Sequence, residues 1–237
     1  MHNIDTSPNV LTDLAITISP DELTGKIKAG ASKQNIVNAA HSLLAKIDNS
    51  WNPALVYRWL PIQRGETTPK NYTLDDCGAS TSLIMGHSSS FIDKAEYALV
   101  ACYTAGNAIE KETQKATTNQ HFLDGYLLDI IDLLVLEKTG NIITDMAEQK
   151  SKELGWGVSP FLSPGSVHGW ELEEQLKLAP LLPLEKIGVN IRPDAVLEPF
   201  KSLTCLIGIG TDYTAKQVGT TCQVCSKNAT CQMRQNQ

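Results

Sequence analysis

The sequence predicts an α+β domain, in which helices and strands share one core. Two helical patterns at 122–138 and 142–154 lie between apolar runs at 54–62 and 97–103 and a later run at 202–209. These segments do not alternate regularly as strand and helix, which argues against a doubly wound parallel sheet. With 237 residues, 42% of them hydrophobic, the chain can bury a substantial core.

Periodicity and residue type predict the elements of the first half. Residues 33–48 carry apolar side chains every three or four positions, which is the spacing of one helix face. Residues 54–62 (ALVYRWLPI) are aromatic and β-branched and predict a strand that ends at Pro61. Residues 97–103 (YALVACY) predict a buried strand, after which 104–107 turn the chain into a further helix.

The middle of the chain predicts extended helical structure. Residues 122–138 and 142–154 form two helices, or one long helix that bends at Gly140 and Asn141. Gly155 suits the position just after the end of such a helix.

The last third changes character. Residues 156–169 are rich in glycine, proline and serine and predict an irregular loop. Residues 171–182 predict a short helix with acidic residues in its first turn, as the helix dipole favours. Residues 186–191 and 202–209 predict strands.

Charge and composition exclude several classes of protein. The formal net charge is −6, from 20 basic and 26 acidic residues, whereas a nucleic-acid-binding protein needs a basic stripe. No apolar run approaches the ~20 residues of a membrane span. The first residues have neither a basic nor an apolar stretch of the kind found in secretory leaders, so we expect a cytoplasmic protein.

These patterns divide the chain into three parts. Residues 1–20 form an N-terminal arm without clear periodicity, 21–212 form the α+β domain, and 213–237 form a cysteine-rich tail.

The tail predicts a metal site. Cys222, Cys225 and Cys231 lie within one short stretch, and thiolates at this density suit zinc or an iron–sulfur cluster. Both usually take four ligands, so Cys205 or a group other than cysteine would complete the set, or one position would stay open. The alternative is a chance cluster of free thiols. Outside the tail, each remaining cysteine is interpreted as a buried small hydrophobic residue; these are Cys77, Cys102 and Cys205.

The segment 159–170 (SPFLSPGSVHGW) is the strongest candidate for a ligand-binding loop. Two prolines and two glycines hold a non-repetitive backbone, whose exposed amides and carbonyls can bind a ligand. The alternative is a simple connector between two elements. Glu137 ends an apolar stretch of helix, so its carboxylate is either solvated or held in a cleft. The sequence specifies no catalytic residue.

Several segments, taken in order, resemble the activation domain of vitamin B12-dependent methionine synthase, and more closely its free-standing relatives. The resemblance covers about 21–210. Its clearest parts are VACYTAGNAIEK (100–111), LLDIIDLLVLEK (127–138), SPFLSPGSVHGWELEEQ (159–175) and EKIGVNIRPDAVLEPFKSLTCLIGIG (185–210). The tail is similar to the cysteine-rich ending of some free-standing relatives, with Arg234 as its last element.

The resemblance implies a twisted antiparallel sheet with packed helices and an S-adenosylmethionine (AdoMet) site. By position, Ser163, Pro164 and Gly165 match the loop that contacts AdoMet through its backbone, and Glu137 matches a helix glutamate that faces the AdoMet cleft.

Two positions of the AdoMet loop depart from the family pattern. Phe161 stands where the family has an arginine, expected to pair with the AdoMet carboxylate, and Ser166 stands where it has a tyrosine. A bidentate arginine–carboxylate contact is among the stronger polar interactions, so its absence bears directly on AdoMet binding.

The function implied by the resemblance is that of a partner or reactivator of a corrinoid-dependent methyltransferase. The chain would bind AdoMet or dock on the cobalamin-carrying protein, and the chemistry would belong mostly to the cofactors. The alternative is a non-enzymatic metal-binding or iron–sulfur electron-relay module that has kept the fold and lost AdoMet binding.

Overall fold

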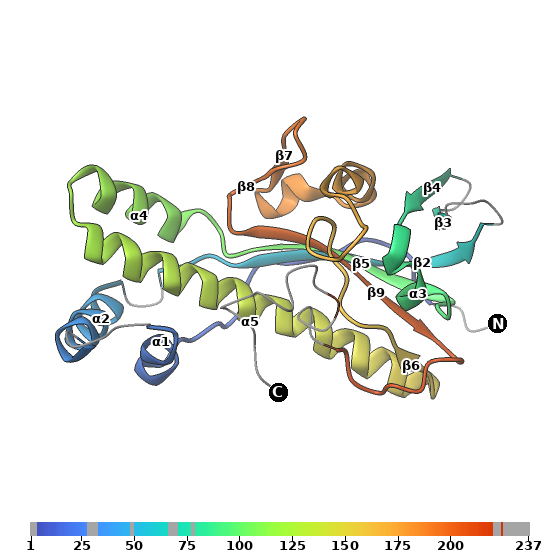
Figure 1. Ribbon diagram of the computed structural model, residues 1–237, viewed down its shortest axis with the longest axis horizontal. Helices are drawn as coiled ribbons and strands as arrows, with labels where there is room; N and C mark the ends of the chain where they lie inside the picture. Colours follow the sequence, from blue (N-terminus) through green and yellow to red (C-terminus); the bar gives the residue numbers. More distant parts are fainter. Residues whose placement is uncertain are drawn as a thin grey trace.

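The computed structural model describes residues 4–27, 33–47, 50–65, 71–76, 79–219 and 224. Its centre is a seven-stranded sheet in the order β4-β3-β2-β5-β9-β6, with β1 paired to β2 (Figure 1). Every strand pair in this sheet is antiparallel. Helices pack on the sheet, so the predicted α+β class with a twisted antiparallel sheet is confirmed.

The three apolar runs form the centre of the sheet. They are β2 (Ala54–Arg64), β5 (Tyr97–Thr104) and β9 (Ser202–Gly210). Seven consecutive residues of β5 are buried, because both faces of this strand are covered, and such strands read as continuous apolar runs.

The predicted end of a strand at Pro61 is wrong, because β2 continues to Arg64. On one side of β2, the pairing with β1 covers 55–57 and the pairing with β3 covers 62–64. Pro61 lies between these two pairings, where that side of β2 has no partner strand. A residue without a backbone N–H is tolerated at such a position.

The remaining strands of the sheet are short. They are β1 (Asn9–Leu11), β3 (Asn71–Asp76), β4 (Ala79–Ile84) and β6 (Gly157–Val158). Strand β1 lies within residues 1–20, which we interpreted from the sequence as an N-terminal arm without clear periodicity.

One face of the sheet is covered by a single 33-residue helix, α5 (Phe122–Leu154) (Figure 1). The helix runs unbroken through Gly140, and a Cβ at that glycine would lie 2.9 Å from the Tyr103 hydroxyl oxygen. The absence of a side chain at Gly140 therefore allows α5 to pack closely against Tyr103 of the sheet, and the helix continues past this residue. As predicted, Gly155 follows the last turn, with a φ of +73°.

Three further helices pack around the N-terminal half of α5. They are α1 (Pro20–Lys26), α2 (Lys33–Ile47) and α4 (Ala108–Thr118). Their shared core includes Leu23, Ala40, Leu43, Leu127 and Ile131.

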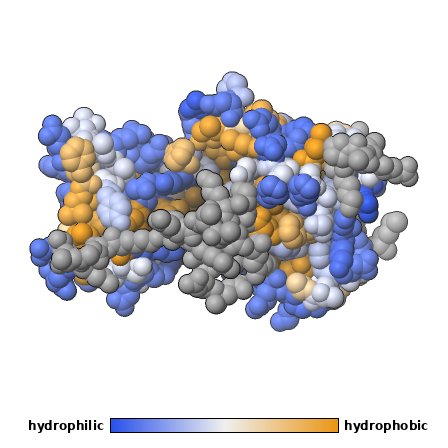
Figure 2. Space-filling view, in the orientation of Figure 1, coloured by the Kyte–Doolittle hydropathy of each residue, from blue (hydrophilic) through white to orange (hydrophobic). Residues whose placement is uncertain are grey.

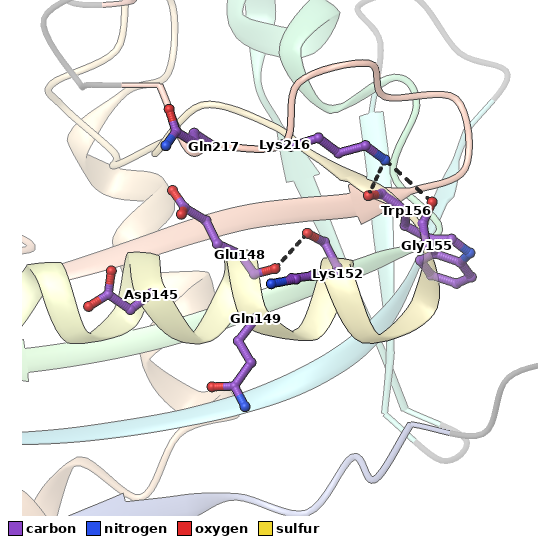
Figure 3. Close-up of a pocket in the computed structure, with 9 residues that line it drawn as sticks. Asp145, Glu148, Gln149, Lys152, Gly155, Trp156, Lys216 and Gln217 are labelled. Atoms are coloured by element: carbon purple, nitrogen blue, oxygen red, sulfur yellow. Dashed lines mark hydrogen bonds between the residues drawn. The ribbon is translucent and has the colours of Figure 1, made fainter.

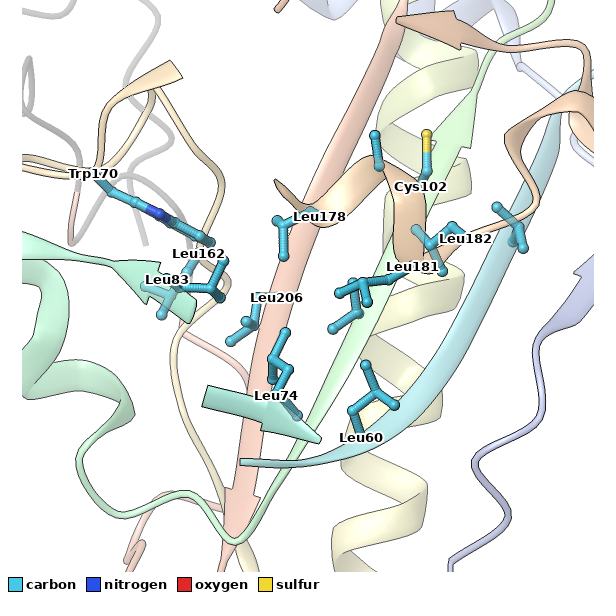
Figure 4. Close-up of a cluster of buried hydrophobic side chains, with 14 of the residues drawn as sticks. Leu60, Leu74, Leu83, Cys102, Leu162, Trp170, Leu178, Leu181, Leu182 and Leu206 are labelled. Atoms are coloured by element: carbon cyan, nitrogen blue, oxygen red, sulfur yellow. The ribbon is translucent and has the colours of Figure 1, made fainter. Parts of the chain in front are cut away.

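The opposite face of the sheet is covered by short turns of helix and one hairpin. They comprise η1 (Gly86–Ser88), α3 (Ser89–Ile92), η2 (Leu172–Glu174), α6 (Gln175–Leu178), η3 (Ala179–Leu181), η4 (Leu184–Ile187), and the hairpin of β7 (Asn190–Ile191) and β8 (Leu197–Glu198). Figure 4 shows the apolar side chains beneath them, among them Leu60, Leu74, Leu162, Leu178 and Leu206.

The predicted strand at 186–191 is wrong over most of its length. Leu184–Ile187 forms a 3-10 turn, and strand structure is limited to Asn190–Ile191. Gly188 separates the two with a φ of +66°, a conformation that glycine adopts without steric cost. No helix among the described residues is long and apolar enough to cross a membrane.

Candidate functional site

The predicted ligand loop is held firmly at both ends. Leu162 and Leu206 exchange two backbone hydrogen bonds of 2.8 and 3.0 Å, which attach the loop to β9. At the other end, the Gly165 N–H donates to the carbonyl of Trp170 at 2.8 Å, and Trp170 is 1% exposed. The loop is thus a fixed part of the core, and the residues between these anchors have a defined position.

Phe161 and Leu162 belong to opposite faces of the sheet. Phe161 packs in the core under α5, edge-on to the Tyr103 ring, with the ring centres 6.4 Å apart. Leu162 packs in the core on the other face. Phe161 therefore lies away from the pocket that the rest of the loop lines.

The four following residues, Ser163, Pro164, Gly165 and Ser166, line one pocket of about 370 Å³, called here the loop pocket. Its other walls come from η2 and α6, from the hairpin, and from the start of β9. These lining residues are Leu172, Gln175, Ala195, Val196, Leu197, Phe200, Ser202 and Leu203. Among these described residues none carries a charge, so the pocket offers apolar surface, hydroxyls and one amide.

A second pocket of about 490 Å³ shares Val196, Leu197 and Phe200 with the loop pocket. It opens between α4 and the hairpin and is called here the charged pocket, because four ionic side chains line it: Glu110, Lys111, Arg192 and Glu198. The two pockets border the same three residues and are together called the groove here, with an uncharged and an ionic half. The shared Phe200 is 69% exposed, so its ring is accessible to a ligand.

Several contacts hold the shared wall in place. The Phe200 N–H donates to the Glu110 carboxylate at 3.1 Å, which connects the wall to α4. The Gln175 side-chain amide donates to the Ala195 carbonyl at 2.5 Å, and the Thr204 hydroxyl donates to the same side chain at 2.7 Å. Gln175 of α6 therefore links Ala195, which precedes the shared residues Val196 and Leu197, to Thr204 of β9 through buried hydrogen bonds.

Lys201 and a buried aspartate lie beside the groove. The Lys201 ammonium is 2.8 Å from Asp129 Oδ1 and 5.5 Å from the centre of the Phe200 ring. Asp132 is 2% exposed, and its Oδ1 has no hydrogen-bond partner among the residues that the structure describes. Burial raises the pKa of Asp132 to about 7, the nearby Lys201 opposes that rise, and Glu110 and Asp129 add to it.

Glu137 does not join the loop residues. Its carboxylate is 2.8 Å from the Lys26 ammonium, so it connects α5 to α1, and it lines neither half of the groove. The structure therefore brings together four of the six predicted AdoMet-site residues and leaves out Phe161 and Glu137.

Sequence reasoning missed Phe200, Arg192 and Lys111 as groove residues. Phe200 and Arg192 lie within the block 185–210 that resembles the family, but no feature of that block marks them as ligand-binding residues. Arg192 lies close to Phe200 in the chain, but Lys111 on α4 and the loop from Ser163 to Ser166 are far from it in sequence, so no local pattern shows that these residues meet.

The predicted metal ligands Cys222, Cys225 and Cys231 lie outside the described residues. In the tail, Val224 is described: it is buried, and its carbonyl accepts the His168 N–H at 3.4 Å. The His168 ring stacks on that of His87, with the ring centres 5.5 Å apart. The part of the chain that is described contains no group of three metal-ligating side chains.

Cys102 and Cys205 confirm the interpretation of the isolated cysteines. Both are fully buried in the central strands. Burial raises the pKa of Cys102 to about 12 and that of Cys205 well above its usual value, so both remain neutral thiols. Cys77 lies outside the described residues.

A larger pocket of about 680 Å³ lies at the far end of α5, against the segment that follows β9 (Figure 3). The Lys216 ammonium there donates to the Trp156 carbonyl at 2.7 Å, just beyond the C-terminus of α5, where a cation is favourable. None of the predicted site residues lines this pocket.

Comparisons with known proteins support the fold alone. No family model matches the chain, and no curated protein matches it by sequence. Among solved structures, it is similar to one described as the MetH reactivation domain bound to AdoHcy, with a TM-score of 0.57 and 13% identity. The match covers 89% of this chain and 81% of that one.

Proposed function

We propose that this chain binds S-adenosylmethionine in the groove and acts as a partner or reactivator of a corrinoid-dependent methyltransferase. One observation carries the proposal: Ser163, Pro164, Gly165 and Ser166 line a pocket in a fold that resembles an AdoHcy-bound reactivation domain. Ser163, Pro164 and Gly165 match the AdoMet loop in the family resemblance, and Ser166 stands where the family has a tyrosine.

The loop pocket has the properties that an adenosine group needs. Its volume of about 370 Å³ falls within the usual range of small-molecule sites. The exposed Phe200 ring offers a flat apolar surface for a base, and Gln175, Ser163 and Ser202 offer polar atoms around it. Gly165 lines the pocket at a φ of +77°, and a Cβ there would lie 3.1 Å from Leu172 Cδ1, so a side chain would crowd the pocket.

In this role the ligand supplies a methyl group to a cobalt centre carried by the partner. The residues of this chain bind and orient the nucleoside and exclude water from it, which is the protein's share of such a reaction.

Calorimetry with AdoMet and AdoHcy tests the proposal. We expect binding by the unaltered chain and at least about fivefold weaker binding by Phe200→Ala, because base stacking on an aromatic ring contributes about 1–3 kcal/mol. Phe122→Ala is a matched control: Phe122 is 67% exposed at the start of α5 and lines neither half of the groove. No heat at millimolar ligand, or equal losses in both variants, would contradict the proposed site.

The partner role has its own test. A corrinoid protein in the inert cob(II)alamin state, supplied with an electron donor and AdoMet, should form methylcobalamin faster when this chain is present, as followed by its visible absorbance. The same rate with and without the chain would remove the reactivation role while leaving ligand binding intact.

We also propose a second function for the tail, in which Cys222, Cys225 and Cys231 bind zinc or an iron–sulfur cluster. Val224 favours it, because this buried residue attaches the tail to the domain beside His168 and His87. Imidazole nitrogens are common zinc ligands. Anaerobically purified chain should contain zinc, or iron with acid-labile sulfide, and Cys222→Ser with Cys225→Ser should lose it. Metal-free protein would contradict this second function.

A further inference from the structure

We infer that the charged pocket binds the amino-acid end of the ligand, with Lys111 on its carboxylate and Glu198 on its ammonium. This inference rests on the proposed function, because it assigns the second half of the same groove. It also explains how a zwitterionic ligand is held by a chain that has Phe161 in place of the family's arginine.

The loop pocket cannot supply ionic contacts. Its described lining has no charged side chain, and Phe161 packs under α5 on the other face of the sheet. AdoMet and AdoHcy, however, each carry a carboxylate and an ammonium, and burying either without a partner is costly. The groove must therefore provide these partners next to the loop pocket.

The charged pocket is placed to do so. It shares the wall of Val196, Leu197 and Phe200 with the loop pocket, so in this proposal the ligand lies against Phe200 with its nucleoside in one half and its amino-acid end in the other. It contains two cations and two carboxylates, the set that a zwitterion needs.

The roles of the four ionic groups differ. Arg192 is 2.7 Å from Asp194 and 3.7 Å from Glu198, so its charge is already compensated, and it holds Glu198 at the rim. The Glu110 carboxylate accepts the Phe200 N–H.

Lys111 has no ion pair among the residues that the structure describes, and it is exposed on α4. Lys111 is therefore the cation available for a ligand carboxylate.

The test compares two ligands and three variants by calorimetry. AdoHcy carries the amino-acid end, and 5′-methylthioadenosine has the same nucleoside and sulfur without it. We expect Lys111→Ala and Glu198→Gln each to weaken AdoHcy by about fivefold to tenfold and to change methylthioadenosine by less than twofold. Lys115→Ala is the matched control, because Lys115 lies one turn further along α4 and pairs with Glu112 at 2.6 Å.

The outcomes separate the two proposals. If both ligands bind and Lys111→Ala affects them equally or not at all, the amino-acid subsite is overturned and the nucleoside site stands. If neither ligand binds the unaltered chain, the proposed function fails and the subsite with it. Added salt supports the subsite if it weakens AdoHcy more than methylthioadenosine, because exposed ionic contacts are screened.

Discussion

The backbone N–H of Phe200 donates to the Glu110 carboxylate at 3.1 Å, so helix α4 helps to position one of the three residues that both halves of the groove share. Loss of the Glu110 carboxylate removes this hydrogen bond between the Phe200 segment and α4. We therefore expect Glu110→Ala to weaken AdoHcy and methylthioadenosine to the same extent, about threefold to tenfold, since one exposed hydrogen bond of about 0.5–1.5 kcal/mol is lost. Glu110→Gln keeps an acceptor and should lose less. A loss confined to AdoHcy would mean that Glu110 acts on the amino-acid end instead.

Gly165 should be required for ligand binding rather than for folding alone. A Cβ there would lie 3.1 Å from Leu172 Cδ1, and the φ of +77° is unfavourable for other residues. Gly165→Ala should lower the free energy of unfolding by about 1–2 kcal/mol and weaken AdoHcy severalfold, because Leu172 must move within the pocket.

Gly155→Ala provides the control for this change. It has a similar φ of +73° and no atom within 4 Å of the added Cβ, so stability should fall similarly while AdoHcy affinity stays unchanged. Unchanged affinity in Gly165→Ala would remove the loop from the site.

Asp132 should make stability depend on pH. Its pKa of about 7 in the folded chain exceeds the ordinary 3.8, mainly because of burial. Below pH 4 the carboxyl is protonated in both states, and between pH 4 and 7 the unfolded chain ionises first, so the free energy of unfolding falls as the pH rises.

Asp132→Asn isolates that contribution. It should be more stable than the parent at pH 8, by at most about 4 kcal/mol, and the difference should vanish toward pH 4. Urea unfolding across this range measures it, and parallel pH profiles for the two chains would disprove the assignment.

Arg58 should be a main stabilising residue of the sheet. It is 7% exposed, donates to both Asp76 oxygens at 2.6 and 2.9 Å, and also donates to the Leu181 carbonyl at 3.1 Å. Asp76→Ala leaves this guanidinium without its carboxylate and should lower the free energy of unfolding by about 2–3 kcal/mol.

Lys150→Ala is the comparison for Asp76→Ala. It removes an exposed pair with Glu153 at 2.9 Å and should leave the unfolding midpoint nearly unchanged. Equal losses in Asp76→Ala and Lys150→Ala would show that the buried pair contributes no more than a surface one.

The sheet and the long helix could be predicted because their patterns are local. The runs at β2, β5 and β9 are apolar on both faces, and α5 repeats its apolar residues at helical spacing. Strands β3 and β4 escaped prediction because their sequences, NYTLDD and ASTSLI, are mostly polar. Their buried apolar residues are Tyr72, Leu74 and Leu83, which are too few to mark a strand by pattern, and backbone pairing with neighbouring strands completes the two elements.

The sequence by itself determined the fold class, the central strands and the loop from Ser163 to Ser166, since each follows from residue types that are close together in the chain. Only the tertiary structure decided what faces that loop. In the folded chain the hairpin and Phe200 lie against the loop, and Lys111 and Glu110 line the charged pocket next to it. Glu137 pairs with Lys26 instead. The physical reason is that a groove is made by packing between distant segments, and nothing in a local pattern records which segments will meet.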